Sequence, residues 1–204
     1  MDTPVNWYEF EHRAVAAGHP LVCGIDEAGR GPLLGPVYAA CVILPLDRQI
    51  EGLNDSKKLS EKKREQLFDV ILEEALSVGV GFATAAEIDE INILQATYLA
   101  MCRAYEAMPY SADWALIDGN RMPPLPIPGE TIVKGDARSA SVAAASILAK
   151  VSRDRVLRQL DEQYPQYGFA KHKGYGTKAH YEAIKQYGLL PEHRRTFLKN
   201  LGEK

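Results

Sequence analysis

Three places in this 204-residue chain put an acidic side chain directly after an apolar run and close to a glycine. They are Asp26 with Glu27 after segment 21–25, Asp118 after 114–117, and Asp136 shortly after 131–133. Short apolar runs bounded by turn-forming residues are typical of buried strands, so each acid is expected near a strand end. Carboxylate oxygens are the hard ligands that Mg²⁺ prefers. The acids therefore indicate a divalent-metal site.

Four converging carboxylates need a cation, because like charges raise one another's pKa values until something neutralises them. Two Mg²⁺ ions roughly 4 Å apart could activate a water, neutralise phosphate oxygens and stabilise a leaving alkoxide. We expect Asp26 and Asp136 to bridge or anchor the ions, with Glu27 and Asp118 completing the ligand shells. Neighbouring side chains of a regular strand point to opposite faces, so Asp26 and Glu27 can share a site only if the strand twists or ends there. The alternative is three unrelated, solvated turns.

A tight turn of sequence Gly29-Arg30-Gly31 follows the first acidic pair. Glycines have no Cβ, so they let backbone N–H groups approach a phosphodiester closely. The planar guanidinium of an arginine binds phosphate through a fork of donors. Acids followed by this turn suit a metal ion that meets a phosphate.

Periodicity predicts the elements that position these residues. Strands are expected at 21–25, 36–44, 78–85, 114–117 and 131–133, and helices at 60–75, 92–108, 139–160 and 177–187. Ser60 and Thr177 are expected N-caps, and the positive end of the helix that starts at 139 should face the acids. Three strands followed by alternating helices and strands favour a mixed sheet over a doubly wound parallel one.

Seven motifs follow one another between about residues 20 and 197, and in this order they resemble the bacterial ribonuclease HII family. They are GIDEAGRGP at 24–32, LNDSKKLS at 53–60, IDGN at 117–120, KGD at 134–136, AAASILAK at 143–150, GFAKHKGYGT at 168–177 and HRR at 193–195. The resemblance implies an α/β fold of the ribonuclease H type, with a mixed five-stranded sheet flanked by helices and a helical C-terminal extension. It also implies that Asp26, Glu27, Asp118 and Asp136 are catalytic and bind Mg²⁺ or Mn²⁺, two ions per active site.

The implied substrates are RNA/DNA hybrids and duplex DNA that contains ribonucleotides. Hydrolysis would fall on the ribonucleotide-containing strand, with incision 5′ to a single ribonucleotide that leaves a 3′-hydroxyl and a 5′-phosphate. The 2′-OH is the group that distinguishes the scissile sugar from deoxyribose, and the backbone amides of Gly29, Arg30 and Gly31 can reach it. By resemblance, Tyr175 stacks on this sugar and donates a hydrogen bond. The alternative for Tyr175 is a loop tyrosine packed on the last helix.

Several basic and polar residues are candidate contacts to the phosphate backbone. Lys57 and Lys58 are the first of these, with exposed lysines of a helix cap as the alternative. Weaker candidates are Ser139, Lys150, Lys171, Lys173, Arg194 and Arg195. His172 lies between two lysines, which favours a surface or phosphate contact over a catalytic base.

The charge distribution supports a nucleic-acid partner although the whole chain carries −3. Residues 134–204 have a net charge of +7, and residues 1–133 have −10. A basic segment attracts phosphates while the acidic part holds cations.

No apolar run approaches the roughly 20 residues of a membrane helix, and the N-terminus does not resemble a signal peptide. We therefore expect a cytoplasmic protein with no membrane partner, and a monomer. One catalytic domain over 1–204 is predicted, with about 160–204 as a basic, substrate-binding extension.

Two other functions stay open. One is an inactive nucleic-acid-binding module with a vestigial acid cluster, which would not need four acids. The other is a small-molecule phosphatase, which would not need the basic segment.

Overall fold

The computed structural model describes residues 6–198 and contains one five-stranded sheet. The strands are β1 (Val22–Ala28), β2 (Val37–Ile43), β3 (Ser77–Ala83), β4 (Trp114–Asp118) and β5 (Gly129–Ile132). Their order across the sheet is β3-β2-β1-β4-β5. The pairs β1–β2 and β2–β3 are antiparallel, whereas β1–β4 and β4–β5 are parallel. The predicted mixed five-stranded sheet is confirmed.

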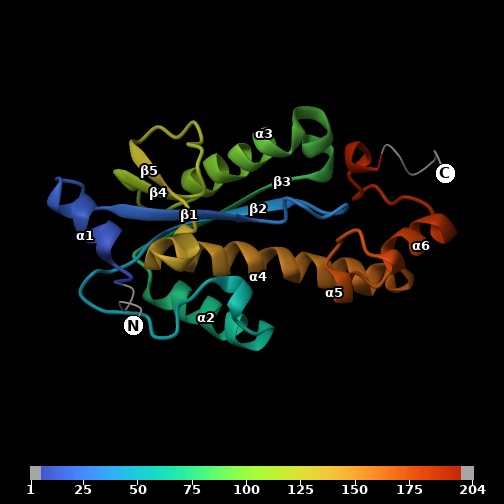
Figure 1. The fold of residues 1–204 in the computed structure, drawn as a ribbon, viewed down its shortest axis with the longest axis horizontal. Helices are drawn as coiled ribbons and strands as arrows, with labels where there is room; N and C mark the ends of the chain where they lie inside the picture. The colour runs from blue at the N-terminus through green and yellow to red at the C-terminus, as the bar shows by residue number, and fades with distance from the viewer. Residues whose placement is uncertain (1–5, 199–204) are drawn as a thin grey trace.

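Helices cover both faces of the sheet, with α3 on one side and α4 on the other (Figure 1). The helices are α1 (Glu9–Ala16), α2 (Glu61–Glu74), α3 (Ala85–Glu106), α4 (Ala140–Gln163), α5 (Phe169–His172) and α6 (Lys178–Tyr187). Short 3₁₀ turns lie at η1 (Ser56–Lys58), η2 (Gly135–Ala137), η3 (Pro165–Tyr167) and η4 (Arg195–Phe197). The expected N-caps Ser60 and Thr177 each accept a hydrogen bond from the first turn of their helix.

Strand alternation divides the core into two layers. Cys23 and Ile25 of β1 pack in the cluster under α3, while Ala40 and Val42 of β2 pack in the cluster under α4 and α2. Gly24 faces α4, and a Cβ at this position would lie 2.1 Å from the carbonyl carbon of Ser141. The glycine therefore lets α4 pack directly against β1, beside the acidic end of that strand.

Two boundaries differ from the sequence prediction. β1 does not end before its acids but runs on to Ala28, because Asp26 and Glu27 pair with Ala40 and Ala39 of β2. α3 begins at Ala85 rather than at Asn92, and it is bent at Asn92, whose φ is 68°. Thr84 and Glu87 form a capping box at its true start.

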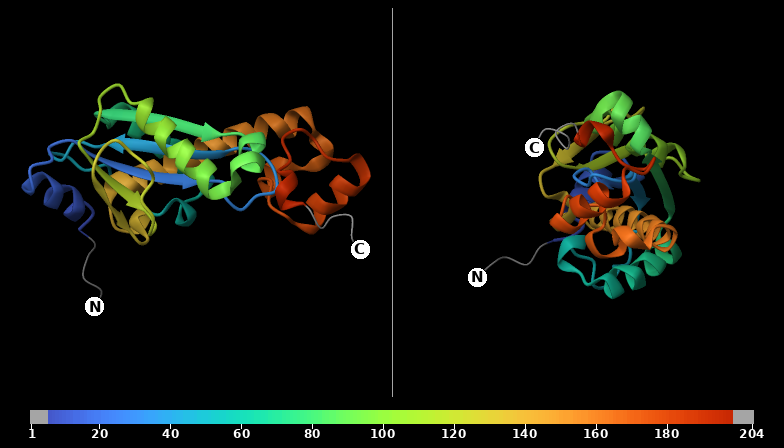
Figure 2. Two further views of the ribbon diagram at one scale, coloured as in Figure 1. Left: turned by 90° about the horizontal axis from the view of Figure 1, so that it is seen from above. Right: turned by 90° about the vertical axis from the view of Figure 1, so that its right-hand side faces the viewer.

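The C-terminal end of α4 and the helices that follow it extend beyond one end of the sheet (Figure 2). α4 continues past the sheet and packs with α5 and α6 around Leu34, Leu157 and Phe169, all fully buried. Leu33 and Leu34 come from the loop after β1, so this third cluster ties the C-terminal helices to the sheet. Within residues 6–198 there is no helix long and apolar enough to cross a membrane.

Candidate functional site

Parallel pairing brings Asp26 and Asp118 to the same edge of the sheet. Ile25 of β1 lies opposite Ile117 of β4, so the next residue on each strand is an aspartate. Asp26 is 4 % exposed. Its burial and the charges of Glu27 and Asp118 raise the pKa of Asp26 well above its ordinary value. The two aspartates are therefore electrostatic neighbours.

Glu27 lies on the opposite face of β1 from Asp26, as strand alternation requires. Burial raises the pKa of Glu27 above its usual range, and Arg30 partly offsets this effect, because one of its guanidinium nitrogens is 3.2 Å from Oε1 of Glu27. Glu27 lines the pocket that contains Asp26 and also the neighbouring pocket that contains Asp118. The pairing of β1 with β2 is regular through Ala28, where the strand ends, and Glu27 nevertheless lines the same pocket as Asp26.

Asp136 is carried to the site by a sharp turn after β5. Lys134 adopts a left-handed conformation with φ 58°, and the N–H of Gly135 donates to Oδ1 of Asp118 at 2.7 Å. Burial, Asp118 and Asp55 raise the pKa of Asp136. Nζ of Lys57 lies 3.6 Å from Oδ2 of Asp136. Burial disfavours the charge of Lys57, but the attraction of Asp136 and Asp26 outweighs it and raises the pKa of this lysine.

The four acids fit a divalent cation by their chemistry. Three of them, Asp26, Glu27 and Asp136, have pKa values raised by burial and by neighbouring carboxylates, which is the electrostatic state that a bound cation relieves. In the part of the chain that the structure describes, no three His, Cys, Asp or Glu side chains form a ready-made metal site. Arg30 and Lys57 pair with Glu27 and Asp136 instead. Metal binding would thus require these two basic side chains to give up their acidic partners.

A pocket of about 240 Å³ opens beside Asp26. Its lining consists of Asp26, Glu27, Ala28, Gly29, Arg30, Gly31, Ser56, Lys57, Ser146, Lys150, Arg153 and Tyr175. The pocket therefore joins Asp26 and Glu27 to the Gly-Arg-Gly turn and to Tyr175, whereas Asp118 lines the neighbouring pocket. The side chain of Tyr175 is 48 % exposed, and its Cε1 lies 3.5 Å from where a Cβ on Gly31 would be. This exposure argues against the alternative of a tyrosine packed on the last helix.

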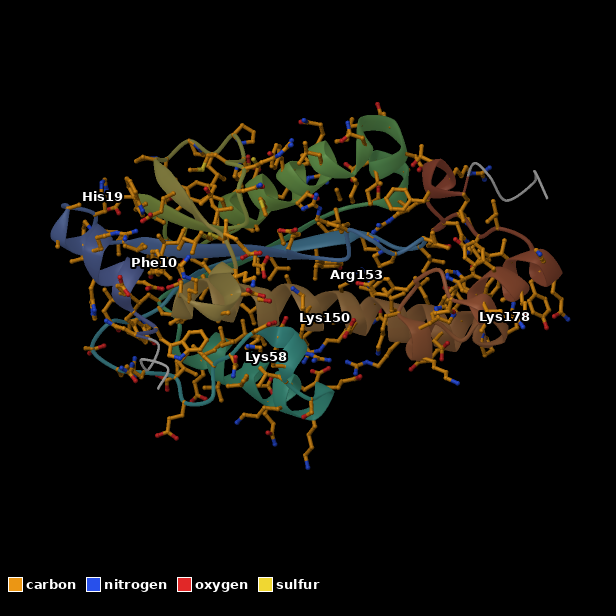
Figure 3. The ribbon with its side chains drawn as sticks, in the orientation of Figure 1. Phe10, His19, Lys58, Lys150, Arg153 and Lys178 are labelled. Carbon is orange, nitrogen blue, oxygen red and sulfur yellow. The ribbon has the colours of Figure 1, made fainter. Side chains whose placement is uncertain are left out.

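The basic candidates differ in how accessible they are. Lys57, Lys58 and Lys171 are exposed. Lys173 is mostly covered, and its Nζ is 3.5 Å from Glu61 on α2. Lys150 donates to Asp154 at 2.6 Å, and burial lowers the pKa of Lys150. Figure 3 labels Lys150 and Arg153 along α4 and Lys58 near α2.

Four sequence-based expectations need revision. Ser139 is fully buried and caps α4, and its Oγ donates to Glu11 at 2.7 Å. The N-terminus of α4 faces Glu11 and not the acidic site, because the carboxylate of Glu11 also accepts a hydrogen bond from the N–H of Ser141. Arg194 is fully buried and bonded to backbone carbonyls, so neither Ser139 nor Arg194 presents a surface to a phosphate. His172 turns inward, and its Nε2 bonds the carbonyl of Tyr167.

Sequence reasoning missed three polar residues that line the pocket, Ser56 on η1 and Ser146 and Arg153 on α4. Ser146, Lys150 and Arg153 follow the i, i+4, i+7 spacing of one helix face, which is a readable signal. Ser146 shares a 2.8 Å hydrogen bond with Ser56, which joins η1 to α4 below the acids.

Comparison with known proteins gives concordant matches. A family model described as ribonuclease HII matches residues 23–200. A ribonuclease HII of Clostridioides difficile is 55% identical over 192 residues, which cover 94% of this chain and 75% of the relative. One of Vibrio campbellii is 59% identical over 180 residues, or 88% and 85% of the two chains. The crystal structure of ribonuclease H2 from Pyrococcus horikoshii superposes with a TM-score of 0.74 at 30% identity, covering 89% and 97%.

Proposed function

The chain belongs to the ribonuclease HII family, and from this membership we propose which bond it cuts and which residues cut it. It is an endoribonuclease of the second ribonuclease H type, an enzyme class that depends on divalent metal and acts on nucleic acid. The fold of the ribonuclease H type agrees with this assignment. The proposed activity is hydrolysis of the ribonucleotide strand of RNA/DNA hybrids, and incision 5′ to single ribonucleotides in duplex DNA.

The proposed metal ligands are Asp26, Glu27, Asp118 and Asp136, which would hold two Mg²⁺ or Mn²⁺ ions. Divalent ions at such a site supply an activated water and neutralise charge on the phosphate. The protein contributes three carboxylates buried enough that their charge is unfavourable without a cation. Arg30 and Lys57, which now pair with two of these acids, would be released toward the substrate phosphates.

The proposed reader of the ribose is the turn Gly29–Gly31 together with Tyr175. The observation that carries this function is the shared pocket, in which Asp26, Glu27, the turn and an exposed tyrosine line one cavity. A phenol ring can stack on a sugar, and its hydroxyl can donate to the 2′-oxygen. A cut made by water would leave a 3′-hydroxyl and a 5′-phosphate, because the 2′-OH is recognised rather than used as the nucleophile.

The remaining proposals concern the whole chain. We propose one catalytic domain in which about 160–204 is the substrate-binding extension; its residues 199–204 lie outside the described residues. We propose that it works as a monomer in the cytoplasm on its nucleic-acid substrates.

A duplex with one ribonucleotide tests this function directly. With Mg²⁺ or Mn²⁺ the protein should incise this duplex 5′ to the ribonucleotide. It should not cut the same duplex in EDTA, and it should not cut the matching all-DNA duplex in either metal. Products that end in a 2′,3′-cyclic phosphate would exclude the mechanism. Binding without cleavage in either metal would favour the inactive binding module.

A further inference from the structure

Arg194 is a fully buried arginine whose partners are backbone carbonyls of a single loop. Its Nη2 donates to the carbonyl of Gly29 at 2.6 Å, its Nη1 to those of Arg30 at 2.9 Å and Pro32 at 2.8 Å, and its Nε to that of Gly35 at 2.9 Å. No carboxylate of the described residues forms an ion pair with it. The guanidinium therefore holds four carbonyls of the loop that follows the acids.

A buried charge without an ionic partner is an expensive way to stabilise a fold. Burial, helped by the nearby charge of Arg153, lowers the pKa of Arg194 to about 9. Arg153 holds the same loop from α4, with bonds to the carbonyls of Leu34 at 3.0 Å and Pro36 at 3.2 Å. It also donates to the carbonyl of Lys173, two residues before Tyr175. The two arginines thus fix the loop relative to Tyr175.

The direction of these carbonyls determines where the loop's N–H groups point. All described peptide bonds are trans, and the C=O and N–H of a trans peptide point in opposite directions. Because the carbonyls of Gly29 and Arg30 face Arg194, the N–H groups of Arg30 and Gly31 face away from it. Neither N–H has a hydrogen-bond acceptor among residues 6–198.

The peptide bond between Pro32 and Leu33 shows what lies on the side of the loop that faces away from Arg194. The carbonyl of Pro32 faces Arg194, and the N–H of Leu33 donates at 2.8 Å to the carbonyl of Gly174, in the loop that carries Tyr175. Gly31 itself lies beside the ring of Tyr175, because a Cβ added at Gly31 would be in van der Waals contact with that ring, 3.5 Å from its Cε1. The free N–H groups and the exposed phenol therefore belong to one surface.

We propose that Arg194 is a positioning residue that aims the N–H groups of Arg30 and Gly31 at the 2′-oxygen of the scissile ribonucleotide. It does so from behind the loop and touches no substrate. This inference rests on the proposed reading of the ribose by the Gly29–Gly31 turn. It assigns to Arg194 the preference for ribose over deoxyribose, not general affinity for a duplex.

The test compares binding of two duplexes that differ by one 2′-OH. Dissociation constants for the single-ribonucleotide duplex and its all-DNA counterpart are measured in EDTA, so that no cleavage occurs, for wild type, Arg194→Met and Arg194→Lys. Two donors lost from the 2′-oxygen should reduce the ribose preference by about 4- to 100-fold, at two- to tenfold per hydrogen bond. Arg194→Lys should fall between wild type and Arg194→Met, because a lysine keeps the charge but cannot span four carbonyls.

Two control variants separate positioning from general effects. Ile184→Ala weakens the same C-terminal core cluster but removes no hydrogen bond to the loop, and it should keep the ribose preference at a comparable loss of melting temperature. Arg48→Met removes a surface arginine that pairs with Glu74, and it should match wild type.

Each outcome decides a different point. If the wild type shows no ribose preference in binding or cleavage, the proposed function fails. If the wild type is selective and folded Arg194 variants are equally selective, or bind both duplexes more weakly by one factor, the positioning role fails alone. If both variants unfold, amide NMR of the wild type decides: the Arg30 and Gly31 N–H signals must shift with the ribonucleotide duplex and not with DNA. Absence of that difference overturns the inference.

Discussion

At the scale of single residues, the acids carry the strongest prediction. Asp26→Asn or Asp136→Asn should abolish cleavage of the single-ribonucleotide duplex. The loss should exceed the about 10- to 100-fold typical of an outer partner of a metal ligand. In metal-free buffer the variants should melt no lower than wild type, because burial and neighbouring carboxylates already disfavour the charge of Asp26 and Asp136. Asp69→Asn, on the exposed face of α2, serves as the control. Wild-type turnover in either variant would remove that residue from the metal site.

The hydroxyl and the ring of Tyr175 should contribute separately. Tyr175→Phe loses one hydrogen bond, worth about 0.5–1.5 kcal/mol, which corresponds to about a two- to tenfold drop in kcat/KM. Tyr175→Ala also loses stacking of about 1–3 kcal/mol. Because Tyr175 is 48 % exposed, its removal should cost little stability, and thermal melting checks this. Tyr110→Phe, at an exposed tyrosine that does not line the pocket, should match wild type. An alanine variant with full activity would show that Tyr175 does not read the ribose.

At the scale of elements, a histidine chain holds the loop that carries Tyr175. The N–H of Leu190 donates to Nδ1 of His193, so the other ring nitrogen of His193 carries the proton and donates to Nε2 of His180 at 3.2 Å. Nδ1 of His180 then donates to the carbonyl of Tyr175 at 2.9 Å. His172 stacks on His180 from α5. The hydrogen bonds of this chain require the rings of His180 and His193 to be neutral.

Acid should therefore weaken the fold through these histidines. Burial, with His180 nearby, lowers the pKa of His193 to about 4, and burial also lowers the pKa of His180. An unfolded histidine takes up its proton near pH 6.5, before the folded one does. The stabilisation is thus present above about pH 6.5 and is lost as the pH falls toward 4.

His193→Gln should accordingly be less stable at pH 7 but lose less stability between pH 7 and pH 5 than wild type does. Denaturant midpoints at the two pH values measure this difference. His12→Gln, at an exposed histidine of α1, should leave the wild-type pH dependence intact. Parallel pH curves for wild type and His193→Gln would contradict the prediction.

Local pattern predicts most elements here, and its errors have physical causes. The apolar strands and the caps at Ser60 and Thr177 were readable because each depends on neighbours in sequence. The extension of β1 through Asp26 and Glu27 was not, because it depends on pairing with Ala39 and Ala40. Arg194 resembles a surface residue in a basic segment. Its burial follows from contacts with a loop about 160 residues earlier, which local sequence cannot show.

The convergence of the candidate site has the same origin. Each acid could be identified by its place after an apolar run. The parallel register of β1 with β4, and the left-handed turn at Lys134, place Asp26, Asp118 and Asp136 near the same edge of the sheet. By contrast, Tyr175 could be identified as a candidate only through the resemblance to a family, because nothing in the local sequence of a loop tyrosine indicates that it lines a pocket.

At the scale of the whole molecule, the acids and the basic segment divide the work. The C-terminal helices extend from the end of the sheet as one body with it, through the cluster around Leu34 and Phe169 (Figure 2). Residues 134–204 have a net charge of +7, but not all of their cations face solvent unpaired. Lys173 pairs with Glu61, and the side chains of Arg153 and Arg194 are buried. Fewer cations than the sequence suggests are therefore available to phosphates.

The salt dependence of duplex binding tests that reduction. Log affinity should fall with log salt, with a slope of about 0.9 for each phosphate contact. Neutralising the exposed Lys171 by Lys171→Gln should flatten the slope by up to about 0.9. Lys173→Gln should change it less, because Glu61 already neutralises Lys173 in the free protein. Lys178→Gln, at an exposed lysine farther along the chain on α6, gives the reference for a cation outside the pocket.

If the slope is unchanged in Lys171→Gln, phosphates bind elsewhere on the molecule, and the acidic edge with Lys57 and Lys58 becomes the surface to examine. An equal effect of Lys173→Gln would mean that its ion pair with Glu61 opens when the duplex binds.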